Sequence, residues 1–100
     1  MNKSNTIDPD KTIAMKSDRS VSRIIDGEAV VVEPKDAMIN IINETGTRIW
    51  ELADGKRTVR EIAGLIAEDF DVSRDRALAD TAEFLLDLKE KGLVILTDRD

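Results

Sequence analysis

The fold is decided by residues 43–62, which read NETGTRIWELADGKRTVREI. Two helix starts lie in this stretch: Asn43 is a favourable N-terminal cap, and Thr58 with Glu61 has the spacing of a capping box. Gly55 separates the two starts, and glycine commonly ends a helix because it adopts a left-handed conformation at little cost. The stretch therefore predicts two short helices in immediate succession, with residues 44–46 acting in the helix start.

A three-strand pattern precedes these helices. Residues 20–25 and 28–33 are rich in Val and Ile and are separated by Asp26-Gly27, a pair that favours a type I′ hairpin turn. Residues 34–36 (PKD) predict a second turn, and residues 37–42 (AMINII) are typical of a third strand. The pattern predicts an antiparallel meander.

A third helix follows the first two. Ser73 is its expected cap, and Lys89 and Lys91 suit the negative end of its dipole before Gly92 ends it. Residues 93–96 are expected to form a short strand or an extended tail. The order of elements predicts an α+β fold in which a three-stranded antiparallel meander is followed by three α-helices, with Trp50 in the core.

The chain has 100 residues, which suits one domain with a single small core. Residues 1–18 are polar, with isolated Ile7, Ile13 and Met15, and are too poor in apolar side chains to offset the entropy of ordering. We therefore expect a disordered tail over 1–18 and a folded domain over 19–100. The sequence contains neither a signal-peptide core nor an apolar run of membrane-spanning length, so we expect a cytoplasmic protein.

The composition argues against several classes of function. Cys and His are both absent, which removes the usual zinc ligands and the Cys-His and Ser-His nucleophile systems. We therefore expect no catalytic residue, no cofactor and no metal. The formal net charge of −6 makes nucleic acid an unfavourable partner, because phosphate binding depends on clustered Lys and Arg.

Two features point to a binding surface. On the third helix the apolar and small side chains cover roughly 220° of the helical wheel, which fits either a central helix contacted on two sides or a helix whose edge lines a groove. The third strand has no Pro or Lys within residues 38–42 to discourage pairing at its outer edge. Either residues 93–96 cover that edge, or a partner peptide docks there as an added strand.

Two other functions use the same third helix. It could be the recognition helix of a DNA-binding regulator, although Asp80, Glu83 and Asp87 on its polar face would repel phosphate. The same three carboxylates lie at i, i+3 and i+7 on one helix face, which also fits a hydrolytic or metal site. Such a row is more often a solvated helix face.

Four segments together resemble the PqqD family of pyrroloquinoline quinone biosynthesis. The resemblance extends from Arg19 to about Leu96 and is carried by their order and spacing: Ile42–Gly46, Ile49–Leu52, Asp54–Ile62 and Leu85–Val94. It implies a winged-helix-like domain that acts as a recognition element for ribosomally synthesised and post-translationally modified peptides (RiPPs). Such proteins bind the leader of a precursor peptide and present it to a modifying enzyme, often a radical S-adenosylmethionine (SAM) enzyme.

The resemblance also implies where the leader binds. It would lie as an added strand beside the third strand, in the groove next to the third helix. The implied strand contacts are Ala37, Met38, Ile39, Asn40, Ile41 and Ile42. The implied helix contacts are Arg76, Ala79, Asp80, Glu83, Leu86 and Asp87. Self-association through the strand edge or a swapped tail is a competing use of these elements.

Overall fold

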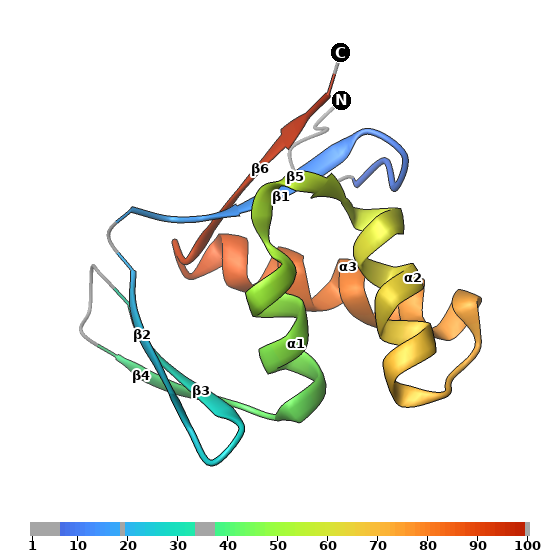
Figure 1. Cartoon of the computed structure of the whole chain (residues 1–100). Helices are drawn as coiled ribbons and strands as arrows, with labels where there is room; N and C mark the ends of the chain where they lie inside the picture. Colours follow the sequence, from blue (N-terminus) through green and yellow to red (C-terminus); the bar gives the residue numbers. More distant parts are fainter. Residues whose placement is uncertain (1–6, 19, 34–37, 100) are drawn as a thin grey trace.

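The computed structural model describes residues 7–18, 20–33 and 38–99 (Figure 1). Its elements are β1 (Thr12–Lys16), β2 (Val21–Ile25), β3 (Glu28–Val32), β4 (Ile39–Ile42), α1 (Glu44–Leu52), β5 (Asp54–Thr58), α2 (Val59–Phe70), α3 (Arg74–Glu90) and β6 (Val94–Asp98). They form two sheets of three strands, in the orders β2-β3-β4 and β5-β1-β6. Figure 1 shows the two sheets at opposite sides of the molecule, with the helices between them. The predicted α+β class and its three helices are confirmed.

The predicted meander is the sheet β2-β3-β4. Its strands are antiparallel, and β3 is central. Asp26 and Gly27 have φ angles of 52° and 82°, as a type I′ turn requires. The third strand begins at Ile39, two residues later than expected. The predicted turn over residues 34–36, and Ala37, lie outside the described residues.

The second sheet corrects a prediction. Residues 12–16 were expected to belong to a disordered tail, yet they form β1, the central strand between β5 and β6. Polar contacts also hold this strand. The Thr12 hydroxyl donates to Asp98 Oδ1 (2.7 Å), and Lys16 Nζ donates to the carbonyls of Glu51 (3.3 Å) and Ala53 (3.2 Å). The strands that pair with β1, β5 and β6, are far from it in the sequence. No local sequence pattern could therefore predict this pairing.

The helix caps are those that the sequence predicts. The Asn43 side chain accepts a hydrogen bond from the N–H of Gly46 (2.8 Å), and the Ser73 hydroxyl accepts one from Arg76 (3.1 Å). Thr58 and Glu61 form both bonds of the capping box. Asp54-Gly55, predicted only as a helix stop, also begins β5, with Gly55 at φ 80°.

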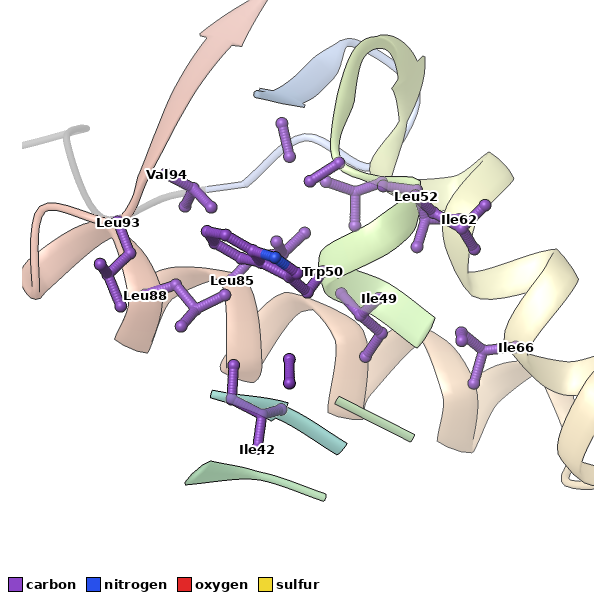
Figure 2. Close-up of a cluster of buried hydrophobic side chains, with 14 of the residues drawn as sticks. Ile42, Ile49, Trp50, Leu52, Ile62, Ile66, Leu85, Leu88, Leu93 and Val94 are labelled. Atoms are coloured by element: carbon purple, nitrogen blue, oxygen red, sulfur yellow. The ribbon is translucent and has the colours of Figure 1, made fainter. Parts of the chain in front are cut away.

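The core lies between the two sheets and is built from all three helices. Trp50 is 2% exposed, and its Nε1 donates to the hydroxyl of Ser22 (3.3 Å). Figure 2 shows its indole among Leu85, Leu88 and Val94. On α3 the residues Ala77, Thr81, Leu85 and Leu88 are buried, while Leu78, Ala82 and Phe84 pack against the core from its margin. The wide apolar span of this helix is therefore largely explained by its central place.

The two ends of the described chain lie together. Arg99 N–H donates to the carbonyl of Lys11 (2.7 Å), because β1 and β6 are antiparallel neighbours. Figure 1 shows this end of the second sheet far from β4.

Neighbouring residues of β1 test the importance of this strand. Ala14 is 0% exposed and Met15 is 44% exposed. We expect Ala14→Asp to lower the free energy of unfolding by roughly 3 kcal/mol or more, because it buries an unpaired charge. The matched control Met15→Asp should cost far less. Urea unfolding followed by Trp50 fluorescence measures both, and equal losses would show that β1 does not contribute to the core.

The capping box on α2 should make stability depend on pH. The hydrogen bond from the Thr58 N–H (2.8 Å) lowers the pKa of Glu61 below its usual value of 4.5. The unfolded chain then binds more protons in this range, so the stabilisation is present above pH 4.5 and is lost as the pH falls through the folded-state pKa.

Glu61→Gln keeps an acceptor oxygen but removes the titration. We expect its free energy of unfolding, measured in urea between neutral pH and pH about 3, to fall less steeply in acid than that of the unaltered chain. Glu68→Gln, on the exposed side of the same helix, is the control and should keep the original slope. The same slope in all three proteins would rule out this role for Glu61.

Candidate functional site

The outer edge of β4 has no strand partner among residues 7–18, 20–33 and 38–99. β4 pairs only with β3, and β6 pairs with β1, so the alternative in which residues 93–96 cover this edge is wrong. Glu33 N–H donates to the carbonyl of Met38 (2.8 Å), which fixes the alternation of the antiparallel ladder. The backbone groups of Ile39 and Ile41 consequently point away from β3, toward the open edge.

Side chains of β4 alternate between two environments. Ile42 and Asn40 pair with Ala29 and Val31, whose side chains are buried against the helices. Ile39 and Ile41 project from the opposite face and are 66% and 71% exposed. In a strand added beside β4, every second side chain would therefore face the helices. The side chains between them would lie on the outer face, beside Ile39 and Ile41.

A buried hydroxyl fixes the end of this ladder. Ala29 N–H donates to Thr47 Oγ1 (2.8 Å), and the same hydroxyl donates to the carbonyl of Ile42 (3.1 Å). Thr47 of α1 thus bridges the last residue pair of the ladder between β3 and β4. This link sets the position of α1 relative to the strand edge.

A cavity of about 460 Å³ opens between α1 and α3, just beyond the last residue of β4. Ile49 and Phe84 supply its apolar surface. The full lining is Asn43, Thr45, Gly46, Ile49, Asp80, Glu83, Phe84 and Asp87. A strand continuing along β4 would pass beside this cavity.

Gly46 keeps α1 close to both walls. A Cβ at this position would lie 2.5 Å from Cγ2 of Ile42 and 3.0 Å from the Phe84 ring. Glycine is therefore required here by space, which is a different reason from a turn conformation.

The carboxylates of the cavity differ in their partners. Asp80 is paired with Arg76 (3.0 Å), and Asp87 with Lys91 (3.2 Å). Lys91 Nζ also donates to Asn40 Oδ1 (3.1 Å), which ties β4 to the end of α3. Glu83 has no hydrogen bond or ion pair with any residue that the structure describes.

A second cavity, of about 390 Å³, borders the other edge of this sheet, beside β2. Arg48 in its lining pairs with two carboxylates, Asp69 (3.1 Å) and Glu51 (3.8 Å). Ile24 and Phe70 supply its apolar surface. The cavity beside β4 is the larger of the two.

The structure brings together part of the predicted site. Asp80, Glu83 and Asp87 line the cavity, and Arg76 is joined to it through Asp80, whereas Ala79 and Leu86 are not among the lining residues. Of the predicted strand contacts, the structure describes Met38, Ile39, Asn40, Ile41 and Ile42, and Ala37 lies outside the described residues.

Some lining residues were not predicted as contacts. From the sequence, residues 43–46 are predicted as a helix start, and Ile49 and Phe84 only as members of the apolar faces of the first and third helices. The one available signal was Gly46 itself, since glycine inside a helix often marks a close approach of two backbones.

A known protein family matches the part of the sequence that forms the site. A family model described as Coenzyme PQQ synthesis protein D (PqqD) matches residues 28–94. The chain belongs to the PqqD family. The match begins with β3 and includes β4, all three helices and every residue that lines the larger cavity.

Solved structures of the same architecture include complexes with peptides. The structure "TbiB1 in Complex with the TbiA(beta) Leader Peptide" has a TM-score of 0.73 and 30% identity, with 80% of this chain and 93% of that chain covered. The structure "Lasso peptide synthetase B1 complexed with the leader peptide" also has a TM-score of 0.73, at 18% identity, with 82% and 96% covered.

A third similar structure is the PqqD truncation of Methylobacterium extorquens PqqCD, described as a functional, stand-alone RiPP recognition element. It has a TM-score of 0.72 and 18% identity, and covers 94% of this chain and 99% of that one. At 18% identity, the lasso-synthetase and Methylobacterium likenesses show the fold alone. The search of curated proteins gave no match.

Two further features concern the described residues only. They contain no group of three or more Asp, Glu, His or Cys side chains placed to hold a metal ion. None of the helices within them has both the length and the apolar character to cross a membrane.

Two glycines test the packing at this PqqD-family site. Gly46→Ala should lower the free energy of unfolding by about 1–3 kcal/mol, because its Cβ would overlap Ile42. Gly64→Ala on α2 is the control: its Cβ would meet nothing within 4 Å, so it should raise stability by roughly 0.5–1 kcal/mol. Thermal unfolding measures both, and a stabilising Gly46→Ala would contradict the close contact of α1 and β4.

Proposed function

We propose that this chain is a non-catalytic adaptor that binds the leader of a ribosomally synthesised precursor peptide and presents it to a modifying enzyme. The observation that carries the proposal is the unpaired edge of β4 beside the cavity between α1 and α3. Membership of the PqqD family and the similarity to leader-bound TbiB1 support it.

In this proposal the leader adds a strand to β4. The N–H and C=O groups of Ile39 and Ile41 would form four backbone hydrogen bonds, each contributing ~1 kcal/mol net. Apolar contact of ~300 Å² at ~25 cal/mol/Å² adds roughly 7 kcal/mol before the costs of ordering and association are subtracted. These magnitudes are sufficient for micromolar binding.

Side chains around the edge would then select the leader. Residues 37–42 supply the strand, and Asp80, Glu83 and Asp87 supply the helix side, with Arg76 held against Asp80. The cavity adds Gly46 and Phe84 to the predicted set.

The partner enzyme that we propose is taken from the family resemblance. A radical SAM enzyme of quinone or related RiPP biosynthesis is the partner that the PqqD resemblance suggests. Because the precursor is made on ribosomes, we place the binding step in the cytoplasm. The acidic groove gives no observation in favour of the DNA-binding alternative.

A proline on the open edge tests strand addition. Ile39→Pro removes an N–H that points away from β3 and so leaves the β3-β4 ladder intact. We expect this variant to fold and to lose at least roughly tenfold in affinity for the precursor leader encoded beside its gene. The control Ile39→Val keeps the N–H and should bind as the unaltered chain does.

Titration of ¹⁵N-labelled protein with that leader measures both the fold and the binding. Chemical-shift changes concentrated at residues 38–42 and at the lining of the cavity are expected. Full binding by a folded Ile39→Pro variant, or shifts confined to another surface, would contradict strand addition at β4.

A further inference from the structure

We propose that the leader of this adaptor carries a Lys or Arg two residues away from an apolar side chain, on the side of its strand that faces α3, and aliphatic side chains on the other side. The inference rests on the proposed function and specifies the chemistry of its peptide. It is built from the register of β4, the lining of the cavity and the ion pairs of α3.

The outer side of the added strand would continue an apolar surface. Cross-strand pairing places residues from all three strands of the meander on the face opposite the helices. Its aliphatic members are Val21, Ile25, Val30, Val32, Ile39 and Ile41, and its charged members are Arg23 and Glu28. Ile39 and Ile41 would flank the added strand, so aliphatic side chains fit its outer positions.

The groove side of the added strand would meet two chemical environments in succession. β4 and α3 run in opposite directions. Asn40 contacts Lys91 at the end of α3, whereas Ile42 and Phe84, further back along the helix, both lie against Gly46. A leader residue beside Ile42 therefore faces the apolar ring of Phe84. The next groove-facing residue, two positions on, lies toward Glu83 and Asp80.

The charge of Glu83 would favour a basic side chain at this second groove-facing position of the leader. Asp80 and Asp87 are neutralised by Arg76 and Lys91, but Glu83 has no partner among the described residues. A Lys or Arg of the leader would complete an ion pair with Glu83 at the rim of the cavity. An Asp or Glu at the same place would add repulsion on a chain that already carries a net charge of −6.

Selection from a random-peptide phage display library tests the inference without knowledge of the natural precursor. The unaltered chain is compared with Glu83→Lys and with the control Glu68→Lys, which places the same charge change on the exposed side of α2. We expect the unaltered chain and Glu68→Lys to enrich peptides with Lys or Arg two residues from an apolar side chain. Glu83→Lys should enrich Asp or Glu there.

Affinity measurements on a selected basic peptide give the second readout. Glu83→Lys should weaken its binding roughly tenfold, because it replaces attraction by repulsion. Glu68→Lys should leave the affinity within about twofold of the unaltered value. Higher salt should weaken binding to the unaltered chain and strengthen binding to Glu83→Lys.

The outcomes separate this inference from the proposed function. One outcome is that the selected peptides shift the amide resonances of Ile39 and Ile41 but have no preferred charge, or have the same preferred charge with Glu83→Lys as with the unaltered chain. That outcome would overturn the inference but leave strand addition at β4 in place. Enrichment of acidic peptides by the unaltered chain would overturn it as well. If no selected peptide shifts those amides, both the proposed function and this inference fail.

Discussion

The site depends on the buried hydroxyl of Thr47. It accepts from Ala29 and donates to Ile42, so one side chain of α1 holds the ends of two strands. A buried hydroxyl is costly unless it is bonded, and here both its donor and an acceptor site are used. Because α1 is fixed at this point, Gly46 and Ile49 lie opposite Phe84, and the cavity forms beside the strand edge. The hydroxyl of Thr47 thereby joins the sheet to the helix that lines the groove.

The second sheet supports this arrangement from the other side of the core. Lys16 of β1 donates to two carbonyls near the end of α1 and lies 5.5 Å from the centre of the Trp50 ring. Its ammonium satisfies carbonyls that the helix leaves unpaired. Burial of this group lowers the pKa of Lys16. One end of α1 is therefore held by β1 and the other by β3 and β4.

Local signals predict most of this fold. The Asp26-Gly27 hairpin and the caps at Asn43 and Ser73 depend on residues a few positions apart, and the sequence shows them directly. The sheet β5-β1-β6 could not be predicted in this way. Its strands are joined across long sequence separations, and β5 reads DGKRT, with no apolar alternation to suggest a strand.

The candidate site also has a part that the sequence predicts and a part that it does not. The strand edge was predictable because nothing in residues 38–42 protects it, and the acidic row of α3 was evident from helical spacing. The cavity was not, because it depends on how α1 approaches α3. Ile49 and Phe84 have the sequence pattern of ordinary core residues, and only the approach of α1 to α3 brings them to one cavity.

The pairing of β1 with β6 has a consequence for larger assemblies. Lys11 and Arg99 are joined by a backbone hydrogen bond at the side of the molecule remote from β4 (Figure 1). A further domain attached close to either Lys11 or Arg99 would therefore start from the same side of the molecule. The architecture permits genetic fusion to an enzyme in both orders, with the adaptor first or last, without altering how its open strand faces solvent.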